Sequence, residues 1–362
     1  MKGLILVNSV YQLITAIQIQ RTFLKGAGAD LLLTDIIPSL KDYGRNLEKL
    51  HLFDRILYGE TKELSRKYAV GKEEEIKEGF RNREQIFRWI LSDSLASYDQ
   101  VYFSNFDTFT RMLACKYDAS SCEFICFEDG FSTYVIDYLR EDRASVNRTQ
   151  EGRKIKEKLK KVLLYEPHLA VRQDTVPNEA LPKISREDTE LKEILNQVFD
   201  YKKPDKMEGF LFLEQSFRAE GIVSNELDLI RSCRELTRGK PFRVKPHPRN
   251  TQILPYRRGI APHGEKEAPW ELYLLNEEPE KLVLLTVCSN AALTGRLLFG
   301  MDIPTVMLYP LFEGRVLWKE DELLKEYLEK FRRQFAGRNY YVPQTIYELK
   351  SILEYLGGSY GQ

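Results

Sequence analysis

The chain has 362 residues, of which 43% are hydrophobic and 30% charged, with 54 basic and 54 acidic side chains. This length favours two domains over a single core, and the composition is typical of a soluble globular protein. A net charge of zero argues against a general nucleic-acid binder, which carries a basic excess. No apolar run approaches the roughly 18 residues that span a membrane. The polar residues that follow the apolar stretch Met1–Val7 break the pattern of a signal peptide.

The five cysteines are odd in number and scattered, which is typical of a reducing compartment. Cys122 and Cys126 have no second pair of ligands nearby, so the sequence disfavours a zinc site. We therefore expect a cytoplasmic protein.

Strand-like apolar runs alternate with helical patterns in the first half of the chain. This alternation predicts a parallel sheet covered on both faces by helices. The expected strands are Gly3–Val7, Ala29–Leu33, Gln100–Ser104 and Glu123–Phe127, and the expected helices are Val10–Phe23 and Glu73–Leu91.

The middle of the chain has a different character. Arg153–Lys161 is a basic amphipathic run, and Asp174–Asp205 is rich in Pro, Asp, Glu and Lys, with one helical segment at Glu190–Phe199. We place the domain boundary here. It gives an N-terminal domain of residues 1–180 and a C-terminal domain of residues 181–362.

A second alternating series follows the boundary. Ligands of parallel α/β sheets bind beyond the carboxyl ends of the strands, so candidate site residues are sought at those ends. The expected strands are Gly209–Leu213, Phe242–Lys245, Lys281–Val287 and Thr305–Leu308, and the expected helices are Glu226–Glu235, Ala291–Phe299, Trp318–Phe335 and Thr345–Tyr355.

His247 stands between two prolines, with Lys245 and Arg249 on the outer sides. Proline fixes φ near −65° and restricts the residue before it, so the imidazole is held on a stiff, extended loop. An imidazole between two cations at the end of a strand can receive an anion such as a phosphate. The alternative is a rigid surface turn.

Glu128 and Asp129 directly follow the expected strand Glu123–Phe127 and precede Gly130. Crowding of like charges raises the pKa of one carboxyl and makes it a better general base. Asp-Gly is also a common turn pair, so turn chemistry is the alternative. Adjacent carboxylates cannot be ranked from the sequence.

Two more polar groups begin expected helices in the second half. Ser289 or Asn290 can cap the helix Ala291–Phe299, or can bind a phosphate at its positive end. Glu271 follows Pro269-Trp270 and suits the first turn of a helix; alternatively, it can hold the two hydroxyls of a ribose.

The first expected strand also ends in polar residues. Asn8, Ser9 and Gln12 can contact a ligand or cap the helix that follows. The chain contains no glycine-rich phosphate loop, no Gly-x-Ser-x-Gly elbow and no Asp-x-Asp pair at a strand end. These absences weigh against ATP, NAD and metal-dependent nucleotide-sugar chemistry.

The order of these motifs resembles that of bacterial sialyltransferases, most closely glycosyltransferase family 52, the lipooligosaccharide sialyltransferase group. The resemblance covers nearly the whole chain. The family has a Ser-Ser motif, whereas at this position the chain has only one serine, Ser289, flanked by Cys288 and Asn290. The motifs that carry the resemblance are Asn8–Leu13, Glu128–Gly130, Lys245–Pro248, Pro269–Glu271 and Ser289.

The resemblance implies a GT-B architecture, with two Rossmann-like domains whose parallel sheets face across a cleft. The donor would be CMP-sialic acid, held mostly by the C-terminal domain. His247 and Ser289 would contact its phosphate, Glu271 the ribose, and Lys245 would lie beside the cytosine. The full expected donor-binding set is Lys245, Pro248, Arg249, Glu271, Ser289, Asn290, Asn8, Ser9 and Gln12.

The implied reaction is a single inverting displacement, with Glu128 as general base and Asp129 as the competing candidate. One phosphate can be neutralised by an imidazolium, a hydroxyl and a helix N-terminus, so no metal or further cofactor is expected. The expected acceptor is a terminal galactose of a lipooligosaccharide or capsular polysaccharide. Two alternatives stay open: another nucleotide-sugar donor, or a non-catalytic glycan-binding protein.

Arg153–Lys161 has two interpretations. It is either a solvated helix with Ile155, Leu159 and Val162 packed inward, or a patch that meets anionic lipid at the inner face of the plasma membrane. The sequence leaves the oligomeric state open.

Overall fold

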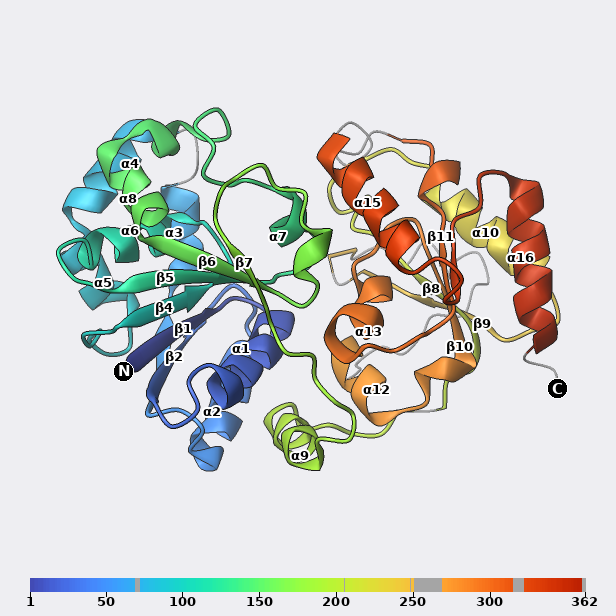
Figure 1. Ribbon diagram of the computed structural model, residues 1–362, viewed down its shortest axis with the longest axis horizontal. Coiled ribbons are helices and arrows are strands. Elements are labelled where there is room, and N and C mark those ends of the chain that lie inside the picture. The colour runs from blue at the N-terminus through green and yellow to red at the C-terminus, as the bar shows by residue number, and fades with distance from the viewer. Residues whose placement is uncertain (69–71, 205, 248, 251–268, 315–321, 360–362) are drawn as a thin grey trace. The chain divides into compact units, whose positions relative to one another are not determined.

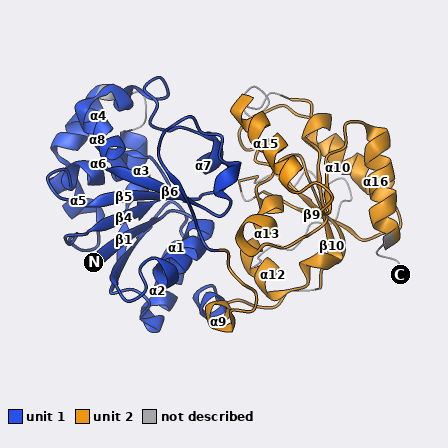
Figure 2. Cartoon of the chain, viewed as in Figure 1, with its two compact units in different colours: residues 1–182, 193–200 blue, residues 183–192, 201–362 orange. Residues whose placement is uncertain are grey.

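The computed structural model describes residues 1–68, 72–204, 206–247, 249–250, 269–314 and 322–359. The chain forms two compact units (Figure 2), the first comprising residues 1–182 and 193–200 and the second residues 183–192 and 201–362. Pro248 and Trp318, which the sequence placed in a site and in a helix, lie outside the described residues.

The first unit is built on a parallel sheet whose described strands run in the order β3-β2-β1-β4-β5-β6-β7 (Figure 1). The order reverses between β1 and β4, as in a Rossmann fold. The central strands are buried along nearly their whole length, as expected of a sheet with helices on both faces. The strands are β1 Lys2–Val7, β2 Gly28–Thr34, β3 Arg55–Gly59, β4 Gln100–Phe103, β5 Glu123–Phe127, β6 Leu159–Leu164 and β7 Asn178–Ala180.

Helix α1 begins after Ser9, whose hydroxyl oxygen accepts a hydrogen bond of 3.2 Å from the backbone N–H of Gln12. The N-cap role expected for Ser9 is therefore confirmed. The helices of this part of the chain are α1 Val10–Thr22, α2 Leu40–Leu50, α3 Thr61–Lys67, α4 Glu73–Arg81, α5 Arg83–Ile90, α6 Thr108–Lys116, α7 Ser132–Val135, α8 Gln150–Lys158 and α9 Thr189–Val198, with short 3₁₀ turns at Ser145–Arg148 and Pro167–Leu169.

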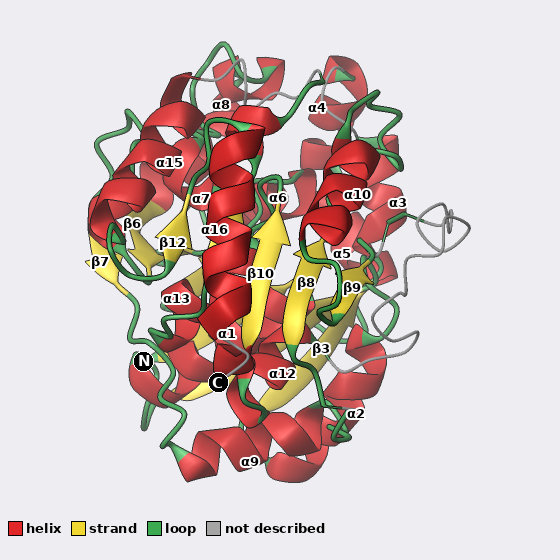
Figure 3. Cartoon of the chain, turned by 90° about the vertical axis from the view of Figure 1, so that its right-hand side faces the viewer, coloured by secondary structure: helices red, strands yellow, loops and turns green. Residues whose placement is uncertain are grey.

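The second unit has a smaller parallel sheet whose described strands run in the order β12-β11-β10-β8-β9. Its order reverses between β8 and β10. Figure 3 shows α10 and α16 in front of these strands, and α12 and α13 lie on the other face in Figure 1. The elements are β8 Gly209–Leu213, α10 Glu226–Leu236, β9 Phe242–Lys245, α12 Trp270–Asn276, β10 Leu282–Thr286, α13 Ala291–Phe299, β11 Thr305–Met307, α15 Glu322–Gln334, β12 Tyr340–Tyr341 and α16 Ile346–Ser359, with 3₁₀ turns at Pro279–Lys281 and Tyr309–Leu311.

Two expected elements are wrong in extent. The single helix predicted over Glu73–Leu91 is broken at Asn82 into α4 and α5. The basic run Arg153–Lys161 is helical only to Lys158, and from Leu159 the chain forms β6 and pairs with β5. The apolar end of β6, residues 162–164, is buried in the sheet, and this burial outweighs the helical pattern of the lysines.

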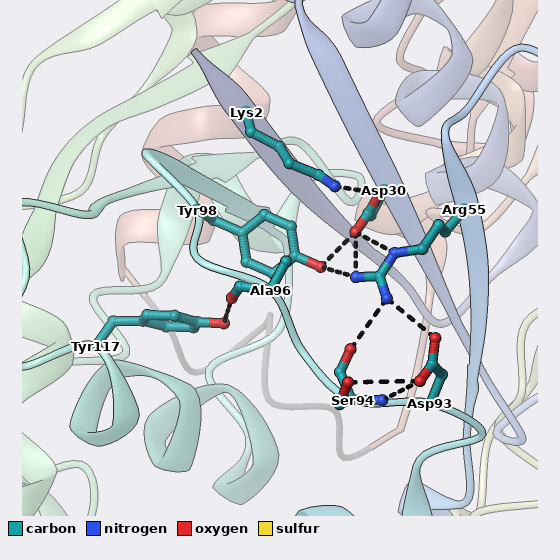
Figure 4. A network of polar contacts seen from close by, with 8 residues as sticks. All are labelled: Lys2, Asp30, Arg55, Asp93, Ser94, Ala96, Tyr98 and Tyr117. Carbon is teal, nitrogen blue, oxygen red and sulfur yellow. Dashed lines mark hydrogen bonds and ion pairs between the residues drawn. The ribbon is translucent and has the colours of Figure 1, made fainter.

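Near the amino ends of the first strands, a polar network surrounds Asp30, which is 0% exposed (Figure 4). Arg55 donates to one carboxylate oxygen from Nη2 at 2.6 Å and from Nε at 3.0 Å, and the Tyr98 hydroxyl donates to the same oxygen at 2.6 Å. Lys2 forms an ion pair of 3.2 Å with the other oxygen. Burial acts to raise the pKa of Asp30, but these donors outweigh it and lower the pKa. The network fastens β1, β2 and β3 together.

All five cysteines are buried free thiols. Among the described residues, no helix combines the length and apolar character needed to cross a membrane.

Candidate active site

The carboxyl edge of the first sheet carries a network of side-chain amides at the point where the strand order reverses. Asn8 follows β1 and donates from Nδ2 to Oδ1 of Asn105, which follows β4, at 2.7 Å. Gln12, at the start of α1, donates to the same oxygen at 2.8 Å. Its own Oε1 accepts the backbone N–H of Asn8 at 2.7 Å. Such a reversal is where open α/β sheets bind ligands.

Asp129 lies in this network and is partly exposed. Gln12 Nε2 donates to its carboxylate at 2.8 Å, and Asn105 also donates a hydrogen bond. Burial raises the pKa of Asp129, while the two amide donors act in the opposite direction without cancelling that effect. Gly130 has φ of 73°, a left-handed conformation that glycine adopts without strain, and it turns the chain away from β5. The expected Asp-Gly turn is present, with the acid aimed into a polar site.

Glu128, the neighbouring acid, is 0% exposed. Its carboxylate accepts the Tyr11 hydroxyl at 2.7 Å, the Tyr134 hydroxyl, and the backbone N–H of Tyr165 at 2.9 Å. These donors come from α1, α7 and the segment after β6. The side chain is thus used to join three parts of the first unit.

A cavity of about 230 Å³ adjoins this loop inside the first unit. Thr133 lines it and also accepts the backbone N–H of Asp129 at 2.9 Å. Tyr138 lines it as well and stacks on Phe106, with ring centroids 5.4 Å apart. The cavity combines an aromatic wall with polar groups, and such a space can accommodate part of a sugar.

In the second unit, the carboxyl ends of β8, β9 and β10 are adjacent. His247 follows β9 and is half-buried. Its Nδ1 accepts the backbone N–H of Arg249 at 3.2 Å, so the neutral ring carries its proton on Nε2. Burial lowers the pKa of His247, and the charge of Arg249 lowers it further against an opposing effect of Glu220. The structure therefore favours a neutral imidazole that donates from Nε2, rather than a resident imidazolium.

Ser289 and Asn290 precede α13. Ser289 is 9% exposed, and its hydroxyl oxygen accepts the backbone N–H of Ala291 at 3.4 Å. Of the two candidate caps, Ser289 thus accepts a backbone N–H of the first turn, whereas Asn290 occupies the N-cap position but makes no side-chain capping bond. Its Oδ1 is buried without a hydrogen-bond partner among the described residues. In the region described, the start of α13 thus holds an unsatisfied polar atom.

Glu271 and Lys245 are brought together by the fold. Glu271 lies in the first turn of α12, where burial raises its pKa and the charge of Lys245 at the end of β9 acts against that rise. Trp270 Nε1 donates to the backbone oxygen of Ala291 at 2.8 Å, which ties the start of α12 to the start of α13. Glu271, Lys245 and the Ser289 region therefore share one edge of this unit.

The remaining predicted donor residues have other partners. Arg249 is exposed and forms an ion pair of 2.9 Å with Glu220. Asn8 and Gln12 bond within the amide network of the first unit, and Ser9 caps α1. Pro248 lies outside the described residues.

Sequence reasoning missed several residues of both edges. Asn105 obeys the positional rule, because it lies two residues beyond β4, yet it carried no motif. Within the described ranges, no three His, Cys, Asp or Glu side chains are grouped so that they could hold a metal ion. The residues missed are Asn105, Tyr134 and Tyr165 in the first unit and Glu214, Arg218 and Asn250 in the second.

Comparison with known proteins gives a family and a fold. Residues 4–309 match the family described as alpha-2,8-polysialyltransferase. No curated protein matches the chain. Among solved structures, UDP-GlcNAc 2-epimerase from Methanocaldococcus jannaschii is similar at 12% identity and a TM-score of 0.55, covering 98% of this chain and 92% of that one.

Two other solved structures are similar over comparable lengths. Arabidopsis thaliana UGT89C1 complexed with UDP-L-rhamnose is 13% identical, with a TM-score of 0.55 and coverage of 98% of this chain and 89% of that one. The calicheamicin glycosyltransferase CalG4 is 11% identical, with a TM-score of 0.50 and coverage of 99% and 90%. At such identities the likeness shows the fold alone, and it confirms the predicted GT-B class of two parallel α/β domains.

Proposed function

Since the chain belongs to the alpha-2,8-polysialyltransferase family and is a glycosyltransferase, we propose that it transfers sialic acid from CMP-sialic acid to a glycan acceptor by a metal-independent, inverting displacement. The observation that carries the proposal is the partly exposed carboxylate of Asp129, held by two neutral amides at a ligand-binding edge. A general base needs an acid that can both hold and release a proton near neutral pH.

We assign the base role to Asp129 and a structural role to Glu128. The raised pKa and partial exposure of Asp129 suit proton removal from a bound hydroxyl. The carboxylate of Glu128 is buried and already accepts two tyrosine hydroxyls and a backbone N–H, so a substrate cannot approach it without displacing them. This assignment reverses the order of preference that the family resemblance implied.

On the donor side, the proposed contacts come from the second unit. His247 would donate from Nε2 to the phosphate, and Ser289 with the start of α13 would bind the same group. The buried Oδ1 of Asn290 has no partner among the described residues. It could accept a hydrogen bond from a hydroxyl or amine of the nucleotide sugar. Glu271 would hold the ribose beside Lys245.

In the proposed displacement, bond formation, bond cleavage and proton transfer occur in one step. The acceptor hydroxyl gives its proton to Asp129, and its oxygen attacks the anomeric carbon as the bond to the CMP oxygen breaks. The phosphate leaves with the electron pair and is stabilised by the His247 N–H and the helix N-terminus. Attack from the face opposite CMP inverts the anomeric configuration.

The acceptor would bind to the first unit, where Thr133, which accepts the backbone N–H of Asp129, lines the cavity together with Tyr138. The family description favours a sialoside acceptor, whereas the resemblance to lipooligosaccharide enzymes favours a terminal galactoside of a lipooligosaccharide or capsular polysaccharide. A panel of both acceptor classes with CMP-sialic acid distinguishes them by CMP release.

A cytoplasmic site of action is part of the proposal, and contact with the inner membrane through Arg153–Lys161 is not. In the structure, Arg153 pairs with Glu141 at 3.4 Å, Lys154 with Asp118 at 3.3 Å, and Lys161 lies 2.8 Å from a carboxylate oxygen of Glu179. Because these basic side chains already pair with acids of the same chain, we favour a solvated surface over a lipid-binding patch. Charge reversal of Lys156 and Lys160 should leave binding to anionic liposomes unchanged.

The decisive test compares Asp129→Asn with Glu128→Gln in the CMP-release assay. We expect Asp129→Asn to lower kcat by about 10²–10⁴ without loss of folding, and Glu128→Gln chiefly to lower the melting temperature. The opposite pattern would transfer the base role to Glu128. Stabilisation by UDP or GDP but not CMP in a thermal-shift assay would overturn the proposed donor.

A further inference from the structure

Glu214 follows β8 directly and is the acid at the edge of the second sheet that the proposed mechanism does not use. Its side chain is 0% exposed. β8 lies between β9, which leads to His247, and β10, which leads to Ser289. The carboxylate therefore stands next to the point where the strand order reverses, beneath the loop that carries the proposed phosphate-binding imidazole.

Three donors from two segments meet at this carboxylate. Oε2 accepts the backbone N–H of His247 at 3.2 Å and Asn250 Nδ2 at 3.1 Å. Oε1 accepts Nη2 of Arg218 at 2.8 Å. One side chain thus holds the loop after β9 at both His247 and Asn250.

Asn250 completes the attachment. Its Nδ2 also donates to the backbone oxygen of Gln215 at 2.7 Å, and its Oδ1 accepts the backbone N–H of Ala219 at 3.1 Å. Its own N–H donates to the backbone oxygen of His247 at 2.8 Å, which closes the loop on itself. The segment from Glu214 to Ala219 is therefore a platform on which the His247 loop is fixed.

The chemistry requires an ionised carboxylate at this position. All three partners are donors, and a carboxylate offers only acceptors, whereas a neutral amide would turn an NH₂ group toward one of them. A buried charge is costly unless it is paired. Arg218, whose side chain is 15% exposed, supplies the compensating charge.

Glu226 is a second buried acid near this platform and differs in its partners. Its Oε1 accepts the backbone N–H of Gln215 at 2.8 Å, and among the described residues it makes no hydrogen bond or ion pair with the His247 loop. This makes Glu226 a matched control for Glu214, because both are buried glutamates that bond the same platform and only one of them reaches the loop.

We propose that Glu214 is a positioning residue that holds the His247 loop so that Nε2 of His247 points at the departing phosphate. The inference rests on the proposed function, because it presumes that His247 contacts the leaving group. It assigns to a buried acid of the second unit an effect on kcat exerted through another residue.

A double-mutant cycle in the CMP-release assay tests the proposal. We expect Glu214→Gln to reduce kcat by about 10–100-fold, since a misplaced catalytic group costs about that much, with little change in KM for the acceptor. In a His247→Ala background, Glu214→Gln should cost almost nothing more, because the imidazole that it positions is gone. The control Glu226→Gln should keep kcat within a few-fold of the wild type.

Each adverse outcome points to a different failure. If Glu214→Gln lowers kcat equally with and without His247, Glu214 acts on folding alone and the positioning role is overturned. If His247→Ala by itself retains normal turnover, the proposed role of His247 fails instead. Should Glu214→Gln not fold, Asn250→Ala removes one arm of the same attachment, and the same non-additivity with His247→Ala is required of it.

Discussion

Two aspartates of the first unit, the buried Asp30 near the amino ends of the strands and the partly exposed Asp129 at the carboxyl edge, are held in opposite ways. Asp30 accepts hydrogen bonds from Arg55 and Tyr98 and pairs with Lys2, and its pKa is lowered. Asp129 accepts hydrogen bonds from the neutral amides of Gln12 and Asn105, and its pKa is raised by burial.

The difference shows how the charge of the partners sets the direction in which the pKa of an acid shifts. Cations fix Asp30 as an anion and make it a fastening between strands. Amides orient Asp129 without supplying a full positive charge, so they do not cancel the rise in its pKa that burial causes. Desolvation acts to raise the pKa of both carboxyls, and the donor set decides whether the pKa is finally raised or lowered.

The largest expected effect is that substitution of one aspartate lowers activity alone, whereas substitution of the other lowers stability alone. Asp129→Asn should lower kcat by about 10²–10⁴ with an unchanged melting temperature, because its amide neighbours tolerate a neutral side chain. Asp30→Asn should do the reverse. Steady-state kinetics and thermal denaturation of both variants measure this, and a parallel loss of both properties in either variant would remove the distinction.

Asp30→Asn is expected to destabilise the protein by about 1.5–3 kcal/mol at pH 7, since Arg55, Tyr98 and Lys2 lose the buried carboxylate that accepts their hydrogen bonds and balances the two cations. The pKa of Asp30 is lower in the folded protein, so its contribution is present above the unfolded pKa near 3.8 and is lost as pH falls through the folded value. Denaturant unfolding at pH 7 and pH 3 should show the two proteins converging at the lower pH. A constant difference would contradict the ion-pair explanation.

Glu226 extends the contrast to the second unit, because burial raises its pKa to about 8, and the charge of Glu214 contributes. Between the unfolded pKa near 4.5 and pH 8 the folded state retains a proton that the unfolded state has released, so stability falls as pH rises through this window. Glu226→Gln should therefore be more stable than the wild type at pH 8 by at least about 1 kcal/mol, with the gain fading toward pH 5. Melting curves at both pH values decide it.

The smallest effects are expected at Gln12. Gln12→Lys places a cation beside Asp129, as at Asp30, and should lower the pKa of the base and shift the acid limb of the pH–rate profile to lower pH. Gln12→Met removes a donor and should shift that limb upward. Turnover should change by about tenfold or less in each variant. Shifts in the same direction would mean that Gln12 acts through packing instead of charge.

Much of the fold could be predicted from local patterns. Glu123–Phe127, Gly209–Leu213 and Ala291–Phe299 are elements with the bounds that the sequence indicated. The helix over Arg153–Lys161 was mispredicted because lysine spacing is helical there while pairing with β5 extends the sheet. Long-range pairing of this kind leaves no signal in a local window.

The candidate site divides in the same manner. The rule that ligands bind beyond strand ends located Asp129, His247 and Ser289 without knowledge of their neighbours. Glu214 and Asn105 also lie beyond strand ends, but they carry no recognisable motif, so nothing in the sequence singled them out. Their roles come from partners far along the chain, such as Asn250, 36 residues after Glu214.

The sequence by itself determined the alternation of strands and helices, the positions of the polar strand ends and a motif order sufficient to indicate a sialyltransferase. Only the tertiary structure separates the two acids, because it buries Glu128 and leaves Asp129 partly exposed, and our proposal that Asp129 is the general base rests on this difference. The groups that bury Glu128 are Tyr11, 117 residues earlier, and Tyr165, 37 residues later. Exposure and proton affinity depend on such distant partners, because a side chain's solvation is set by what the fold packs around it.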